Sequence, residues 1–205
     1  MTLSRRDAEY VIRLDGKDLM GSRMMGSEQA LAELGCERAR TKKGAMVLVG
    51  GLGIGFTART ALDLLPPDAT LVISALMPIV VEWNEGPLGP FAGHPLRDPR
   101  VRVEIGDVGD HLRKNRGVYD ALLLDIDNGP AAFTQRSNAN LYDEAGLRAS
   151  REALRAGGIY AGWGAADDPS FDARMRKHGF DAKTHHVRGR AKQGGPRHAV
   201  FIGKL

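Results

Sequence analysis

The fold is decided by the stretch Met46-Val47-Leu48-Val49-Gly50-Gly51-Leu52-Gly53-Ile54-Gly55-Phe56-Thr57. An apolar run with β-branched residues leads directly into a cluster of glycines, and a helix-compatible segment, residues 57–65, follows it. This order predicts a strand, a tight loop and a helix. A loop with few side chains lets a nucleotide lie against its backbone, and the first N–H groups of the helix face the space above the strand. We therefore interpret the stretch as a cofactor-binding loop, with a tight turn that holds no ligand as the open alternative.

The composition is that of a folded globular protein. The chain has 205 residues, of which 42% are hydrophobic and 26% are charged, and this length suits one domain with a small appendage. The N-terminus has basic residues but no apolar segment after them, and no window approaches the roughly 18 apolar residues of a membrane span. The single cysteine, Cys36, cannot form an internal disulfide. These features predict a cytoplasmic protein with no membrane partner.

Basic residues are concentrated near the C-terminus, where they supply much of the formal net charge of +4. A basic surface can bind nucleic acid or an acidic substrate. No aromatic residues for stacking on bases are interleaved with these positions, so we favour a solvated surface over a nucleic-acid partner. The residues concerned are Arg174, Arg176, Lys177, Lys183, Arg188, Arg190, Lys192 and Arg197.

The rest of the chain alternates between strand-like and helix-like segments. Asp15-Gly16 lies between two short runs with apolar residues and predicts a hairpin turn, and Ser27 is expected to be the N-cap of the first helix. Further strands are predicted at 69–74, 101–105, 119–125 and 159–163, with a terminal pair at 181–187 and 198–204. Helical patterns occupy the intervals at 78–83, 111–115, 141–154 and 171–178.

This alternation predicts an α/β fold with a mostly parallel sheet that helices cover on both faces. In such a sheet ligands bind at the carboxyl ends of the strands, and Asp107 and Asp125 both fall at such ends. We expect a short N-terminal hairpin and helix in residues 1–40 and a Rossmann-like nucleotide-binding domain in residues 41–205.

The spacing of the glycines narrows the class of nucleotide. In a dinucleotide fingerprint the third glycine follows the second by three residues, but Phe56 stands there and the spacing is Gly51-x-Gly53-x-Gly55. The loop also lacks the Gly-Lys-Ser/Thr of a P-loop. The pattern resembles the first motif of class I S-adenosylmethionine-dependent transferases. Their seven-stranded sheet closes with an antiparallel final strand, which is compatible with the terminal strand pair expected here.

Later motifs are similar in order and spacing to the spermidine synthase family, over residues 10–165. They are Asp98-Pro99-Arg100-Val101-Arg102-Val103, Gly106-Asp107, Tyr119-Asp120 through Asp125, Gly129-Pro130, Leu141-Tyr142 and Gly157-Gly158-Ile159. Leu14-Asp15-Gly16 resembles the end of the family's N-terminal β domain, so we expect most of that domain to be absent from this sequence. The resemblance implies S-adenosylmethionine or its decarboxylated form as donor, a small-molecule amine as acceptor, and a homodimer.

The resemblance also assigns the residues that would bind the cofactor. Asp107 and Val108 would contact adenine, although Asp107 could instead be an ordinary helix N-cap. Asp125 would lie at the reacting end of the donor. The loop glycines would approach the methionine-like part and the ribose; they are Gly50, Gly51, Gly53 and Gly55.

Asp125 is expected to orient and deprotonate the acceptor amine. Transfer from a sulfonium is an in-line displacement with an already activated donor, so the enzyme mainly aligns the reactants and keeps the amine neutral. Asp127 could bind the substrate amine or form a turn, and Asp125 could also be a turn residue. Tyr142 could either line the acceptor pocket or pack in the core. No nearby His or Glu completes the Asp-x-Asp pair, so we expect no metal.

Two departures from the family pattern leave three functions open. Where the family has a carboxylate that holds the ribose hydroxyls, this chain has Ser74-Ala75-Leu76-Met77, and residues 125–130 are shorter than the family's substrate-gating segment. The leading hypothesis is methylation of an amine with S-adenosylmethionine. The alternatives are aminopropyl transfer from decarboxylated S-adenosylmethionine, and a non-catalytic binding protein that has lost cofactor affinity.

Overall fold

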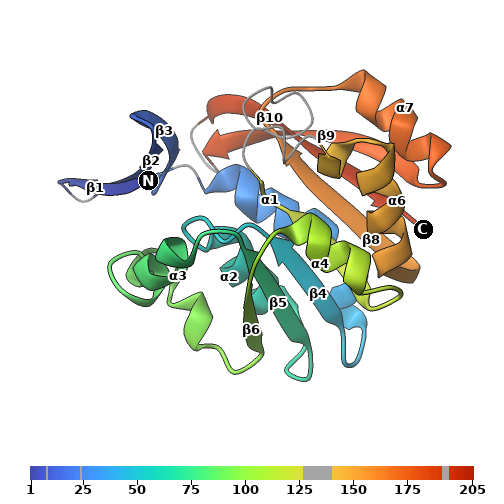
Figure 1. The fold of residues 1–205 in the computed structure, drawn as a ribbon, viewed down its shortest axis with the longest axis horizontal. Helices are drawn as coiled ribbons and strands as arrows, with labels where there is room; N and C mark the ends of the chain where they lie inside the picture. Colours follow the sequence, from blue (N-terminus) through green and yellow to red (C-terminus); the bar gives the residue numbers. More distant parts are fainter. Residues whose placement is uncertain (8, 24, 127–139, 191–193) are drawn as a thin grey trace.

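The computed structural model describes residues 1–7, 9–23, 25–126, 140–190 and 194–205. They form a three-stranded antiparallel sheet at the N-terminus and a seven-stranded sheet that contains the rest of the strands (Figure 1). No helix in these residues is long and apolar enough to cross a membrane.

The seven-stranded sheet has the order β6-β5-β4-β7-β8-β10-β9. Strands β4 to β8 pair in parallel, and β10 runs antiparallel to both of its neighbours. This arrangement confirms the predicted class I fold, including the antiparallel strand near the end of the chain. The strands are β4 (Met46–Gly50), β5 (Thr70–Ala75), β6 (Val101–Ile105), β7 (Tyr119–Leu124), β8 (Leu154–Gly164), β9 (Asp181–Arg190) and β10 (Gly194–Lys204).

Helices cover both faces of this sheet because its central strands are apolar on both sides. Val47 and Val49 pack into one core with α1, α2 and α3, while Leu48 between them packs into a second core with α4, α6 and α7. The two-residue period of a strand produces this division. The helices are α1 (Gly26–Gly35), α2 (Phe56–Leu64), α3 (Pro78–Glu85), α4 (Val108–Lys114), α6 (Glu144–Ala153) and α7 (Pro169–Lys177).

The small sheet consists of β1 (Thr2–Arg6), β2 (Glu9–Leu14) and β3 (Lys17–Gly21). The predicted hairpin is β2–β3, with Asp15 and Gly16 at φ 50° and 77° in its turn, whereas β1 was not predicted. Ile12 of β2 packs against Ile54 and Phe56 at the end of the glycine loop. The hairpin therefore lies beside the segment that was expected to hold the cofactor.

The start of α1 differs from the prediction. The N-cap is Met25, and Ser27, which is 2% exposed, instead shares a hydrogen bond of 2.9 Å with Nδ1 of the buried His198. The earlier start turns the first residues of the helix inward, toward the sheet. Glu28 follows Ser27 and is also buried.

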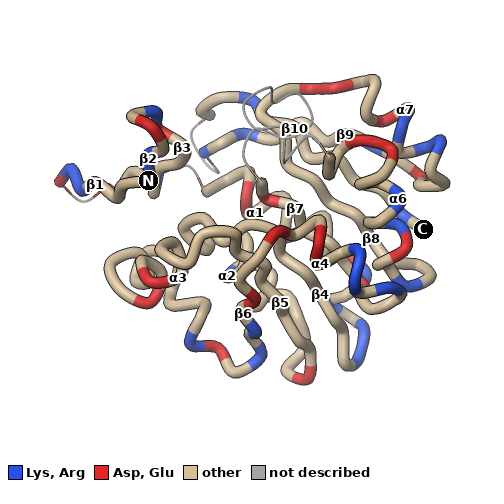
Figure 2. The backbone as a smooth tube through the Cα atoms, viewed as in Figure 1, with Lys and Arg blue, Asp and Glu red and all other residues tan. Residues whose placement is uncertain are grey.

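Lysines and arginines are spread around the periphery of the molecule rather than gathered in one stripe (Figure 2). In the C-terminal region, Lys177 pairs with Glu144 at 2.5 Å and Arg174 with Asp168 at 3.4 Å. Lys192 lies outside the described residues, and the solvated role of this basic region stays a prediction.

Candidate functional site

The glycine loop after β4 is held tightly between β5 and β7. Gly51 donates its N–H to the carbonyl of Ser74 at 3.0 Å, and the N–H of Asp125 donates to the carbonyl of Gly50 at 2.8 Å. Gly51 has φ +91°, and a Cβ there would lie 2.2 Å from the carbonyl oxygen of Asp125. Only glycine fits both the dihedral angle and the space.

A buried asparagine fixes the far side of the loop. Asn84 of α3, which is 1% exposed, donates from Nδ2 to the carbonyl of Gly53 at 2.8 Å and to that of Val80 at 2.9 Å. The side-chain amide thereby satisfies two backbone carbonyls and ties α3 to the loop. The sequence analysis did not assign Asn84, although a polar residue on the apolar side of a helix is a recognisable signal.

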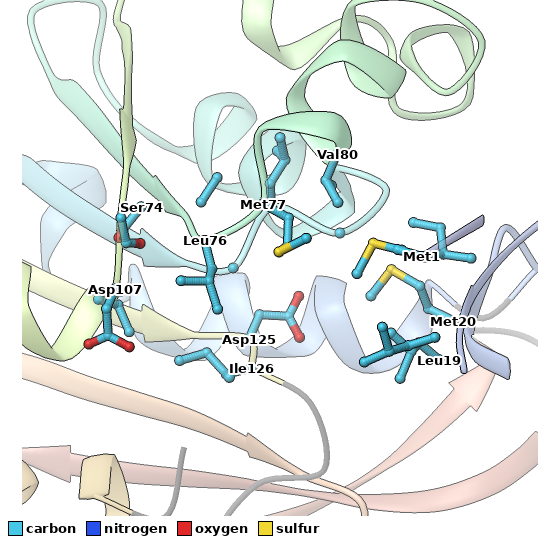
Figure 3. Close-up of a pocket in the computed structure, with 18 residues that line it drawn as sticks. Met1, Leu19, Met20, Ser74, Leu76, Met77, Val80, Asp107, Asp125 and Ile126 are labelled. Atoms are coloured by element: carbon cyan, nitrogen blue, oxygen red, sulfur yellow. The ribbon is translucent and has the colours of Figure 1, made fainter. Parts of the chain in front are cut away.

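A cavity of about 230 Å³ opens at the carboxyl ends of β4, β5, β6 and β7, between these strands and the small sheet (Figure 3). The loop and strand ends contribute Gly51, Leu52, Gly53, Gly106, Asp107, Val108, Asp125 and Ile126. The remaining wall is almost entirely apolar. It consists of Met1, Ile12, Leu14, Leu19, Met20, Ser74, Ala75, Leu76, Met77 and Val80.

The cavity brings together most of the residues expected to bind a cofactor. Gly51, Gly53, Asp107, Val108 and Asp125 all line it. Gly50 and Gly55 flank the loop, Gly50 as the last residue of β4 and Gly55 as the N-cap of α2. Asp107 also caps α4, because its Oδ1 accepts the N–H of Asp110 at 3.0 Å. Both interpretations of Asp107 are therefore compatible with its position.

Asp125 directly follows β7, and its carboxylate is held from the loop helix. Thr57, in the first turn of α2 and 2% exposed, donates from Oγ1 to Oδ2 of Asp125 at 2.7 Å. A hydrogen bond donated to a carboxylate favours its charged form. In Figure 3 the carboxylate of Asp125 points toward Met1 and Met20, whereas that of Asp107 points away from them. Thr57 was not predicted as a site residue.

A second carboxyl group lies close enough to Asp125 to interact with it electrostatically. Glu28 of α1 is 9% exposed, and Oε2 has no hydrogen-bond partner among the described residues. Burial and, next, the negative charge of Asp125 raise the pKa of Glu28 well above its usual value, against the smaller effect of a hydrogen bond from its own backbone. Glu28 therefore keeps its proton to a higher pH than an ordinary glutamate does.

The sequence analysis did not single out Glu28, yet a signal was present. The buried face of α1 follows the helical spacing of Glu28, Leu31, Ala32 and Gly35. A glutamate on such an apolar face is expected to need a specific partner.

The end of β5, where the spermidine synthase family has a ribose-binding carboxylate, is apolar in this structure. Ala75 ends β5 and is 3% exposed, and Leu76 and Met77 after it are 54% and 39% exposed at the cavity. Among the described lining residues, only Asp107 and Asp125 carry a carboxylate.

One of the proposed catalytic residues, Tyr142, is not among the described residues at the cavity, and another, Asp127, cannot be placed. Tyr142 is 3% exposed and packs edge-on against Phe171, with ring centroids 5.7 Å apart, and it is not among the described residues that line the cavity. The structure thus favours the core-packing interpretation of Tyr142 over a place in the acceptor pocket. Asp127 lies outside the described residues.

No protein-family model matches the chain, and no curated protein sequence matches it. The structure is similar to a spermidine synthase in complex with the transition-state analogue AdoDATO, with a TM-score of 0.73 at 17% identity, covering 100% of this chain and 71% of that one. It is also similar to human methyltransferase-like protein 13 in complex with SAH, with a TM-score of 0.61 at 16% identity, covering 87% of this chain and 79% of that one. For precorrin-6y C5,15-methyltransferase from Geobacter metallireducens GS-15 the TM-score is 0.60 at 13% identity, covering 85% of this chain and 86% of that one.

These similarities establish the fold. The chain has the Rossmann-like fold of class I S-adenosylmethionine-dependent transferases. Its overall arrangement resembles that of the spermidine synthases, whose similarity extends over the whole chain.

Proposed function

We propose that the protein is an S-adenosylmethionine-dependent transferase that methylates an amine of a small molecule. One observation carries the proposal: the carboxylate of Asp125 lines the same cavity as the glycine loop and is held in place by Thr57. The adenosyl compounds named with two structural neighbours, AdoDATO and SAH, support an adenosyl ligand for a cavity in this position.

The residues present fit such a donor along most of its length. The backbone of Gly51 and Gly53 would receive the amino-acid part, where the lack of side chains leaves room, and Asp107 and Val108 would border the adenine. When bound, S-adenosylmethionine supplies a sulfonium methyl group that is already activated for transfer. The apolar end of β5 gives the ribose hydroxyls no carboxylate.

Asp125 would act on the acceptor rather than on the donor. An ammonium ion has no lone pair, so an amine must give up a proton before its nitrogen can attack the methyl carbon. The carboxylate of Asp125 can attract the ammonium, accept that proton and hold the nitrogen in line. With the amine held in this way, the C–S bond of a bound donor would break as the N–C bond formed, and the neutral thioether would leave.

Two other functions rest on specific observations. The similarity to spermidine synthases over the whole chain favours aminopropyl transfer from decarboxylated S-adenosylmethionine. The apolar sequence Ala75-Leu76-Met77 favours a binding protein without catalytic activity, because a ribose-binding acid is missing from it.

Calorimetric titration with both donors distinguishes these functions. We expect heat on adding S-adenosylmethionine, followed by formation of S-adenosylhomocysteine when an amine is present. Selective binding of the decarboxylated donor would support aminopropyl transfer instead of methyl transfer as the function. If neither donor gives heat at millimolar concentration, both enzyme proposals fail.

A further inference from the structure

We propose that the acceptor is a monoamine with an apolar body, whose nitrogen pairs with Asp125 and whose body lies among Leu19, Met20 and Met77. This inference specifies the substrate class of the proposed function and rests on it for the transfer step. The binding of the amine does not depend on the donor chemistry, so it can be tested separately.

The apolar wall is large and accessible. Leu76 and Met77, at 54% and 39% exposure, are among the large apolar side chains that the described structure leaves most exposed, and both line the cavity. Leu19 and Met20 of the hairpin face the same space (Figure 3). Exposed apolar surface inside a cavity gains free energy when an apolar ligand covers it. Methionines, which are flexible and polarisable, adapt to ligands of varied shape.

Among the described lining residues, Asp125 supplies the negative charge that faces this wall. Asp107, the other lining carboxylate, is engaged in capping α4 and is turned away from the methionines. No Lys, Arg or His side chain occurs among the described lining residues. The described lining residues thus offer one carboxylate that faces an apolar surface, which matches a ligand with one ammonium group.

Glu28 limits the charge of this anionic end. Two ionised carboxylates in one buried place repel each other, so one of them retains a proton. Thr57 donates to Asp125, while Oε2 of Glu28 lacks a partner in the described part of the chain. The hydrogen bond from Thr57 favours a charged carboxylate at Asp125, whereas the burial of Glu28 favours its neutral form, so one negative charge is available to pair with a cation.

A diamine fits this arrangement poorly. Its second ammonium group would lie against methionine and leucine side chains and would lose its hydration without gaining a partner. The same apolar wall that accepts a hydrocarbon body therefore selects against polyamines.

The first test compares three ligands of equal length by calorimetry on the full chain, with and without S-adenosylhomocysteine. The ligands are hexylamine, the hexane diamine with an amine at each end, and hexanol. We expect hexylamine to bind about tenfold more tightly than either of the others. The inference is overturned if the diamine binds as tightly as hexylamine, if hexanol does, or if hexylamine does not bind under either condition.

The second test compares two amide substitutions. Asp125→Asn removes the charge and should weaken hexylamine binding by more than about tenfold, whereas Glu28→Gln preserves the neutral partner and should change it by less than about threefold. Glu33→Gln, on the exposed side of the same helix, is the control. Equal losses in the first two variants would overturn the assignment of the charge to Asp125.

The third test is designed to reverse the preference for the monoamine over the diamine. Met77→Glu places a second carboxylate in the apolar wall and should make the diamine the tighter ligand. Val103→Glu is the matched control, because Val103 is similarly exposed, at 37% against 39%, but does not line the cavity. An unchanged preference in Met77→Glu would overturn the inference. Hexylamine binding with the expected selectivity but without transfer from either donor would refute the proposed function and leave the inference standing.

Discussion

The two sides of the cavity differ in the chemistry of their side chains. The side built by the glycine loop and the end of β7 has little side-chain bulk and contains the Thr57–Asp125 hydrogen bond. The side built by the end of β5 and the N-terminal hairpin is formed by methionine, leucine and alanine. The first side is suited to transfer chemistry and the second to the choice of ligand. The same cavity therefore combines groups that suit a reaction with an opposite wall whose side chains favour particular ligands.

The largest effect is expected on the side with the carboxylate. Asp125→Asn keeps the shape of the side chain but removes its charge and most of its basicity, so turnover should fall by about a factor of a hundred to ten thousand. Donor binding should stay close to wild type, which calorimetry can check. Asp68→Asn, at an exposed turn, is the control. Unchanged turnover would remove Asp125 from the proposed role.

The next effect concerns the backbone that supports this side. Gly51 has φ +91°, and Gly51→Ala places a methyl group against the carbonyl of Asp125. We expect this substitution to lower the free energy of unfolding by about 2 to 5 kcal/mol. Gly117 has φ +63° with nothing within 4 Å of an added Cβ, so Gly117→Ala should cost only about 1 kcal/mol. Urea denaturation measures both. Equal losses would show that the close approach of Gly51 to Asp125 is not a constraint.

A substitution at Ala75, on the apolar side, tests how the absence of a ribose-binding carboxylate affects the affinity for the donor. Ala75→Glu restores a carboxylate at the end of β5, and we expect donor affinity to rise by about tenfold through hydrogen bonds to the ribose hydroxyls. Ala75→Gln has nearly the same volume without the charge and should gain less. A loss of affinity in Ala75→Glu would show that this side of the cavity is organised around a different group.

The smallest effect is a change in how stability depends on pH. The pKa of Glu28 is raised in the folded state, so the unfolded chain releases this proton first as the pH increases. The favourable contribution of protonated Glu28 is complete below about pH 4.5, its ordinary pKa, and is lost as the pH rises toward the folded-state value. Glu28→Gln should therefore match wild type near pH 4 and be more stable than wild type at pH 8. Thermal unfolding at both values tests this, and an equal difference at the two pH values would contradict it.

Local patterns in the sequence predicted the carboxylate side well. The glycine spacing, the buried strand before Asp125 and the terminal strand pair each depend on residues close together in the chain, and the structure confirms the loop, β7 and the antiparallel β10. Sequence similarity alone could not separate Tyr142 as a pocket residue from Tyr142 as a core residue, because the contact with Phe171 that favours the core forms only in the folded chain.

The residues that the sequence analysis did not predict form contacts with partners that are far away in the sequence. Thr57 reaches Asp125 over 68 positions, and Ser27, expected to cap its own helix, is bonded instead to His198, 171 positions away. Glu28 and Met20 come close to Asp125 and the glycine loop only because α1 and the small sheet fold beside them. Tertiary contacts of this kind have no signature in local sequence patterns.

A crystal structure with S-adenosylhomocysteine tests the central claim most directly, because it shows whether the glycine loop places a sulfur atom opposite Asp125. We predict the amino-acid part over Gly51 and Gly53, the adenine beside Asp107 and Val108, and the sulfur facing the Asp125 carboxylate. A cavity that stays empty at saturating ligand, or a ligand whose sulfur faces away from Asp125, would contradict the proposed function.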